Sequence, residues 1–376
     1  MVLPDYLYRF IFYILIAILT LITGFIYVNS TNKKIISIKP AGSYTSFIFS
    51  SFIAFFLILF IGFRPVSGVF VDMPMYAFAY NNIYDEFASI NWSEEWLWQN
   101  ISYFCKYIGL GEAGYFVVCE ILYIVPMFLA CCILTPRHVW PAFLMVIASF
   151  SFFSYGVNGI RNGVGCSIVF LSVALLTKNN YCKVISILLM LMAYSIHHST
   201  LLPSFCALVS LTFVRETKYA IVFWFISIFI SLIAGNVFSD ILANAGFDDR
   251  TSYFKDIATD EVIEEEAINT GFRFDFLLYS AIPVLFVWYL TIKRNFKDKI
   301  YNILANTYIL ANAFWVIVIR ANFSNRFAYL SWFLYPLIIA YPLLRMNIWE
   351  DQDRKSALII LAYSGFTLFM YFIYYG

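Results

Sequence analysis

The fold class follows from the stretch LYRFIFYILIAILTLITGFIYV, which occupies residues 7–28 and contains one charged side chain, Arg9. A helix of about 20 apolar residues is long enough to cross the hydrocarbon core of a bilayer. No small-residue cleavage site follows the stretch. We therefore expect it to be retained as a membrane span rather than removed as a signal peptide.

Similar apolar runs recur along the whole chain. Of its 376 residues, 62% are hydrophobic and 12% are charged, against about 25% charged in a typical soluble domain. The pattern predicts an all-α polytopic membrane protein with about twelve transmembrane helices in a single domain over residues 1–376. We expect these spans near residues 7–28, 45–63, 113–134, 140–156, 161–177, 183–198, 200–214, 219–239, 272–292, 300–319, 326–345 and 356–374.

Basic residues are distributed unequally between the two sides of this topology. Most of the 24 Lys and Arg residues fall in short loops on one side, including 33–39, 178–183 and 293–299. Cytoplasmic loops of membrane proteins carry such an excess, so we expect this side to be cytoplasmic and both termini to be outside. The net charge of +1 predicts no nucleic-acid partner.

Two longer loops, at about 64–112 and 240–271, then lie on the outer side. The first contains Trp92, Trp96 and Trp98, a pattern that favours a helix or re-entrant segment at the membrane interface. The second is rich in Asp and Glu, which is typical of a solvated loop.

Several arginines lie at outer ends of spans, against the usual charge bias. Such placement is costly unless each arginine has an anionic partner or substrate, and the planar guanidinium suits phosphate and diphosphate. We favour an anion site on the outer side over the alternative, in which each arginine snorkels to headgroups or pairs with an acid such as Asp72 or Asp275. The arginines concerned are Arg64, Arg161, Arg273, Arg320 and Arg326.

The stretch YGVNGIRNG, residues 155–163, interrupts one apolar run with three glycines and two asparagines, Asn158 and Asn162. A helix restarting here would place Arg161 and Asn162 near its N-terminus, where free N–H groups and the helix dipole favour anions. An ordinary Gly/Asn turn is the alternative.

Two of the three histidines, His197 and His198, are adjacent at the outer end of a span. Neighbours on a helix point about 100° apart, so a shared metal ion is disfavoured, and the cysteines form no CxxC or CxxH pair. We expect no metal and no cofactor. One imidazole facing a cavity as a proton acceptor or phosphate donor is the favoured interpretation, and a structural hydrogen bond is the alternative.

Two further groups lie on the outer side. Arg320 and Arg326 flank a tight turn, and Tyr329 lies about one helical turn from Arg326 on the same face. In the first outer loop Asp72 and Tyr76 are spaced as helical neighbours, although Pro74 disturbs a helix there. Asp72 is a candidate general base for a sugar hydroxyl or a counter-ion for Arg64.

These motifs resemble the EpsG-like branch of the Wzy-type polysaccharide polymerases over roughly residues 45–345. The most specific part is the central arginine followed by a His-x-Ser element. The interval from Gly68 to Asp72 is longer than the Gly-x-Asp of that family. The residues that carry the resemblance are Arg64, Gly68, Asp72 and Tyr76, then Asn158, Arg161 and Asn162, then Ile196, His197, His198 and Ser199, and finally Arg326 and Tyr329.

The resemblance implies a GT-C-like glycosyltransferase in the bacterial inner membrane, with its active site facing outside and without a cofactor. Its donor would be a growing chain on undecaprenyl diphosphate and its acceptor an incoming lipid-linked repeat unit. A chain-length regulator and a flippase are further candidate partners.

The resemblance also implies roles for single residues. His198, His197 or Asp72 would accept the proton of the acceptor hydroxyl, and we prefer His198 to His197. The diphosphate and the sugars would contact the remaining candidates, Arg161, Arg326, Arg320, Arg64, Arg273, Asn158, Asn162, Tyr329 and Tyr76.

The nearest alternative is an O-antigen ligase, which performs the same chemistry on a lipid A core. Such ligases have one large outer loop, whereas this sequence has two of medium length. A lipid-linked oligosaccharide flippase or other transporter is a second alternative, but internal repeats are absent and the ionisable residues concentrate near the outer ends of the spans. A non-enzymatic assembly partner of a polysaccharide synthase is a third.

Overall fold

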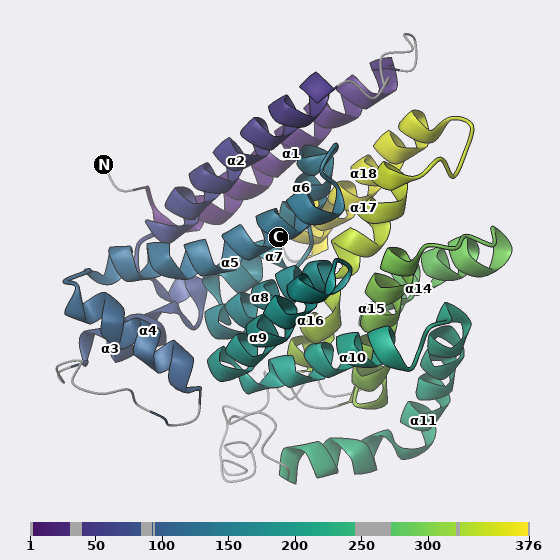
Figure 1. Cartoon of the computed structure of the whole chain (residues 1–376). Coiled ribbons are helices and arrows are strands. Elements are labelled where there is room, and N and C mark those ends of the chain that lie inside the picture. The colour runs from purple at the N-terminus through teal and green to yellow at the C-terminus, as the bar shows by residue number, and fades with distance from the viewer. Residues whose placement is uncertain are drawn as a thin grey trace. The chain divides into compact units, whose positions relative to one another are not determined.

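The computed structural model describes residues 3–30, 40–83, 92, 95–244, 272–320 and 324–374, and in this part of the chain all regular elements are helices (Figure 1). Among the described residues, 8 helices are long and apolar enough to cross a membrane. This confirms an all-helical polytopic membrane protein. The eight segments are Asp5–Val28, Tyr44–Gly62, Glu112–Leu134, Thr217–Gly235, Phe274–Lys293, Lys299–Ile317, Arg326–Arg345 and Gln352–Tyr374.

Helices also lie over the other predicted segments, but they are shorter. Residues 140–156 form two pieces, α6 (Val139–Ile147) and α7 (Phe152–Val157), while α8 (Ile160–Leu176), α9 (Asn180–Ile196) and α10 (Leu201–Thr212) cover the next three. A total of twelve spans therefore stays a prediction, as do the GT-C-like architecture and the single domain.

The two predicted outer loops have different outcomes. Residues 64–112 contain a 3-10 turn (Gly68–Phe70) and two helices, α3 (Met73–Asn81) and α4 (Trp96–Tyr107), so the expected helical segment is present. Its position at a membrane interface stays a prediction. The second loop begins later than predicted, because α11 (Thr217–Asn244) continues to Asn244, and its remaining residues 245–271 lie outside the described residues.

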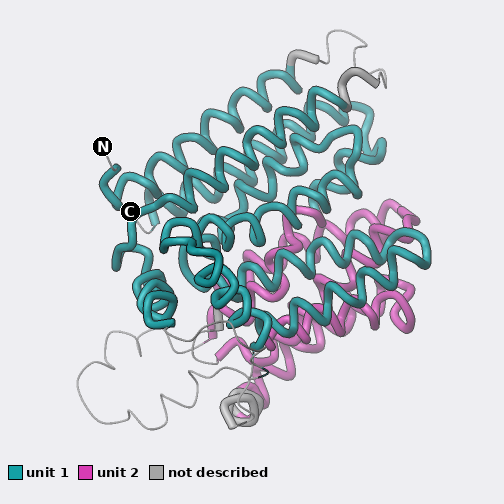
Figure 2. Tube along the Cα trace, turned by 60° about the vertical axis from the view of Figure 1, so that its left-hand side comes forward, with its two compact units in different colours: residues 1–197, 339–376 teal, residues 198–338 magenta. Residues whose placement is uncertain are grey.

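The chain divides into two compact units (Figure 2). Unit 1 comprises residues 1–197 and 339–376, and unit 2 comprises residues 198–338. In unit 1, α1 (Asp5–Ser30) packs against α18 (Gln352–Phe369), α2 (Pro40–Gly62) packs against α5 (Glu112–Leu134), and α8 packs against both α5 and α9. A Cβ atom at Gly62 would lie 2.8 Å from the Val117 Cα, so α2 and α5 cross with their backbones nearly touching.

Unit 2 is organised around α15 (Lys299–Ile317), which packs against α10, α11, α14 (Phe274–Trp288) and α16 (Ser324–Trp332). Its centre is the fully buried Asn312. The Asn312 amide accepts a hydrogen bond from Trp224 Nε1 at 2.7 Å and donates to the hydroxyls of Ser280 and Ser331 at 3.1 and 2.9 Å. One side chain thus links four helices by polar contacts in an otherwise apolar interior.

Candidate functional site

The site in unit 1 begins with the interruption between α7 and α8. Asn158 is extended, Gly159 has a left-handed φ of 65°, and α8 starts at Ile160, so the predicted helix restart is confirmed. A Cβ atom at Gly163 would lie 2.6 Å from the Tyr155 carbonyl oxygen. These two glycines permit the sharp turn that places Arg161 in the first turn of α8.

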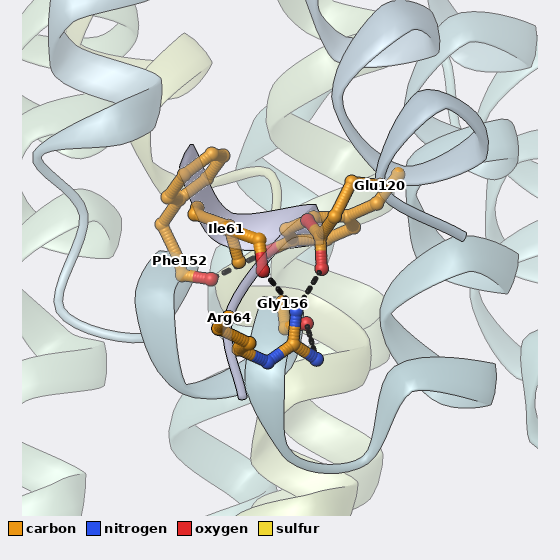
Figure 3. A network of polar contacts seen from close by, with 6 residues as sticks. Ile61, Arg64, Glu120, Phe152 and Gly156 are labelled. Carbon is orange, nitrogen blue, oxygen red and sulfur yellow. Dashed lines mark hydrogen bonds and ion pairs between the residues drawn. The ribbon is translucent and has the colours of Figure 1, made fainter. Parts of the chain in front are cut away.

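Arg64 is buried beside this interruption (Figure 3). Its Nη1 donates to the Ile61 carbonyl at 2.6 Å and lies 3.1 Å from Glu120 Oε1, and its Nη2 donates to the Gly156 carbonyl at 3.2 Å. The Arg64 and Glu120 side chains are 0% and 1% exposed. Arg64 therefore neutralises a buried acid and binds a carbonyl near the interruption, and we assign it a structural role instead of the predicted contact with substrate.

The cluster with partly exposed charges lies around Glu95. One carboxylate oxygen, Oε2, accepts a hydrogen bond from Arg161 Nη1, and the other, Oε1, lies 2.5 Å from His197 Nδ1. The Glu95 side chain is 11% exposed, whereas those of Arg161 and His197 are 33% and 26% exposed. The carboxylate thus forms the inner part of the cluster, and the guanidinium and the imidazole form its accessible part.

Local structure explains how Glu95 reaches these partners. Glu95 precedes α4 with left-handed backbone angles of 52° and 37°, and its side chain does not cap that helix. A left-handed glutamate is uncommon because its Cβ crowds the backbone. Since α4 packs against α9, the carboxylate lies beside the end of α9, where His197 follows Ile196.

Tyr76, on α3, lies at the border of the cluster, and Asp72 lies one turn before it in the sequence. The Tyr76 ring is 6.0 Å from the Arg161 guanidinium and contacts the edge of Trp98. Burial raises the pKa of the Tyr76 phenol, and the positive charge of Arg161 acts in the opposite direction. Asp72 is buried and directly precedes α3, and the Tyr76 amide donates to its carbonyl at 3.2 Å. Pro74 does not disturb this helix, because it falls in the first turn, where no N–H is needed.

The two histidines do not share a helix, contrary to the helical geometry assumed from sequence. His197 is extended, with φ −154° and ψ 118°, and its amide donates to the Ala193 carbonyl at the end of α9. His198 begins a 3-10 turn that extends to Thr200 and belongs to unit 2. His197 thus contacts the cluster through Glu95, and the preference for His198 over His197 as proton acceptor stays a prediction.

The remaining predicted residues lie in unit 2. Arg273 forms two hydrogen bonds with Asp275, at 3.0 and 2.7 Å, and covers the Phe276 ring at 3.8 Å. Arg273 thus pairs with a neighbouring acid, which was the alternative to an anion site for the outer arginines.

The structure places Arg320 6.0 Å from the Phe272 ring. Arg326 and the buried Tyr329 share α16 as predicted. A common anion site formed with Arg161 stays a prediction. Asn158 and Asn162 lie at the α7–α8 interruption, and Asn162 Oδ1 accepts a hydrogen bond from Cys166 Sγ at 3.2 Å.

Sequence reasoning missed Glu95 as a site residue, although this residue lies within the predicted first outer loop, residues 64–112. One signal was available: an arginine on the outer side needs an anionic partner, and Glu95 directly precedes the aromatic start of α4. Glu120 carried a similar signal, because it is the one acid within an apolar run, residues 113–134.

Comparisons with known proteins give a single result. No curated relative and no solved structure matches the chain. The model of the EpsG family matches residues 47–376, a range that includes all of the cluster residues and leaves out α1 and the first residues of α2. The chain therefore belongs to the EpsG family.

Proposed function

We propose that this membrane protein is a polysaccharide polymerase, a glycosyltransferase that joins undecaprenyl-diphosphate-linked oligosaccharide repeat units at the outer face of the bacterial cytoplasmic membrane. Membership of the EpsG family supports a role in polysaccharide biosynthesis. The observation that carries the proposal is the cluster of Arg161, Glu95 and His197 at the start of α8. It combines a cation for a diphosphate with an imidazole for proton transfer.

Arg161 is the residue that we assign to the diphosphate. Its side chain is one-third exposed, and it lies in the first turn of α8, where the helix dipole also favours an anion. As the bond between the anomeric carbon and the diphosphate breaks, negative charge grows on the leaving group. A fixed guanidinium stabilises this charge without a metal ion.

Aromatic side chains near the cluster suit the sugars. Trp92 is exposed, with its ring centroid 4.9 Å from that of Trp96, and Tyr76 and Trp98 contact each other closer to Arg161. Aromatic faces pack well against the apolar faces of sugar rings, and tryptophan also offers an N–H donor. We propose that this surface holds the repeat units on either side of the bond that forms.

The test is a gel of surface polysaccharide from a host lacking this gene. Lanes would be complemented with wild type, with Arg161→Ala and with Arg137→Ala, an exposed arginine away from the cluster. We expect the ladder to collapse to a single repeat without the gene and to return with wild type and Arg137→Ala but not with Arg161→Ala.

The other outcomes separate the alternatives. Loss of every repeat from the lipid core, with accumulation of lipid-linked material, would indicate a ligase or a flippase. An unchanged ladder in the deletion strain would exclude a role in polysaccharide assembly.

A further inference from the structure

Glu95 contacts both other members of the cluster, the Arg161 guanidinium and the His197 imidazole. An ionised carboxylate only accepts hydrogen bonds, and a guanidinium only donates them. The pairing of Glu95 Oε2 with Arg161 is therefore fixed in direction. The pairing of Oε1 with His197 Nδ1 at 2.5 Å is fixed in direction too, because Nδ1 must carry the proton.

We propose that Glu95 is a positioning residue that holds His197 in the Nδ1-protonated tautomer, so that His197 rather than His198 accepts the proton of the acceptor hydroxyl. This inference rests on the proposed function for its catalytic part. Neutral histidine carries one proton on its ring, so with Nδ1 protonated its lone pair is on Nε2. Nε2 is at the far side of the ring from Glu95.

The backbone supports the same assignment. The His197 amide is held by the Ala193 carbonyl at 2.9 Å, so the residue is anchored to the last turn of α9. Its side chain is anchored by Glu95, which directly precedes α4. Two helices that pack together thus fix the His197 imidazole: α9 sets its position, and α4, through Glu95, sets its orientation.

The chemical step balances with these groups. The acceptor hydroxyl oxygen forms a bond to the anomeric carbon of the donor, and its proton moves to His197 Nε2. The bond from that carbon to the diphosphate oxygen breaks, and its electron pair leaves with the lipid diphosphate. The imidazole gains one positive charge beside Glu95 while the leaving group gains one negative charge beside Arg161, so each new charge has an opposite charge next to it.

The substitution Glu95→Gln tests this tautomer directly. The new amide has one oxygen acceptor and one NH2 donor. Because Arg161 can only donate, the oxygen faces Arg161 and the NH2 faces His197 Nδ1. Nδ1 must then accept, and the proton moves to Nε2. We therefore expect this variant to reverse the tautomer of His197 while keeping the size of the side chain.

Nitrogen NMR of ¹⁵N-histidine-labelled protein in nanodiscs reads the tautomer. The chain has only 3 histidines, so His197→Asn and His198→Asn assign the signals. At alkaline pH, wild type should show His197 with a protonated Nδ1 and Glu95→Gln with a protonated Nε2. The control is Glu216→Gln, an exposed glutamate that pairs with Lys218, and it should leave the His197 signals unchanged.

Kinetics with a lipid-linked repeat unit supply the second readout. Glu95→Gln should lower kcat about 100-fold, the scale of one general base, and change KM much less, since its amide oxygen still contacts Arg161. His197→Asn should lower kcat to a similar extent, and the double variant should lose no more than either single variant. His198→Asn should lower kcat less than His197→Asn.

An unchanged His197 tautomer in Glu95→Gln would overturn the positioning role. A reversed tautomer with an unchanged kcat, or a larger loss of kcat in His198→Asn, would overturn the part of His197 as proton acceptor. A wild-type protein without polymerase activity would refute the proposed function and that part with it. The tautomer assignment would still stand or fall on the NMR spectra alone.

Discussion

Arg64 and Arg161 each contact a glutamate, but their surroundings differ. The Arg64 side chain is 0% exposed and binds two backbone carbonyls in addition to Glu120, whereas Arg161 is 33% exposed. A buried ion pair costs desolvation, and breaking it leaves an uncompensated charge. The same residue type therefore holds a helix interruption in one position and is partly exposed in the other, where we propose that it binds the diphosphate.

Removing one partner of the buried pair should destabilise unit 1. We expect Arg64→Met to lower the free energy of unfolding by about 3–5 kcal/mol, because Glu120 loses its counter-charge. The measurement is the unfolding temperature of the purified protein, followed by tryptophan fluorescence on heating, and this temperature should fall. The exposed pair of Glu216 and Lys218 is the control, and Glu216→Gln should leave that temperature unchanged.

A double variant distinguishes charge from packing. Among the described residues, Arg64 Nε and Glu120 Oε2 are buried without a hydrogen-bond partner, so the pair is incompletely satisfied. Replacing both residues, as in Arg64→Met with Glu120→Leu, should recover much of the stability that Arg64→Met loses. A double variant no more stable than Arg64→Met would show that the lost contacts with the Ile61 and Gly156 carbonyls dominate instead.

At the scale of helices, the sequence predicted most of the spans because hydropathy and length act locally along the chain. The helix restart before Arg161 was also predictable, since Gly159 and Gly163 mark it. The partner of Arg161 was not, because Glu95 is 66 residues from Arg161 and 102 from His197. The packing of α4 and of α8 against α9 brings these residues together.

The interruption between α7 and α8 should be sensitive to a single methyl group. Gly163→Ala would place a Cβ atom 2.6 Å from the Tyr155 carbonyl oxygen, so α7 must move relative to α8. A displacement of about 1 Å at a catalytic group can cost about 100-fold in rate, and we expect a loss of polymerisation on this scale. The rate of chain extension in isolated membranes is the measurement.

The control for this variant is Gly365→Ala on α18, where an added Cβ meets nothing within 4 Å. It should retain wild-type polymerisation and equal abundance in the membrane. Equal rates for Gly163→Ala and Gly365→Ala would contradict the requirement for glycine at the interruption.

The buried hydrogen bonds of Asn312 should contribute to the stability of unit 2. Asn312→Leu leaves the buried N–H of Trp224 without its acceptor and should lower stability by about 1–2 kcal/mol, the scale of a hydrogen bond inside a membrane protein. Resistance to proteolysis in detergent is the measurement. Thr212→Val is the control, since the exposed Thr212 hydroxyl contacts only the Leu208 carbonyl of its own helix. A similar loss of resistance in both variants would argue against a special role for Asn312.

At the scale of the whole molecule, the proposed orientation can be tested by labelling with cysteine reagents. We expect an impermeant maleimide to react with Gly111→Cys in intact cells, because residue 111 is exposed and an added Cβ there meets nothing within 4 Å. Lys297→Cys, also exposed, should react only after permeabilisation. The wild-type chain measures the background from its own 7 cysteines. The reverse pattern would place the cluster on the cytoplasmic side and contradict the positive-inside assignment.

Unit 1 is built from two stretches of chain with all of unit 2 between them. α1 ends at Ser30 and α18 begins at Gln352, yet Tyr13 stacks on Tyr371 at 4.1 Å and Gly24 faces Leu361. A ribosome therefore delivers α1 to the membrane long before its helical partner exists. Until translation passes residue 352, lipid or an insertion factor must cover that face of α1, and a stalled chain keeps it exposed to membrane proteases. The pairing of α1 with α18 thus marks a chain whose synthesis has been completed through α18.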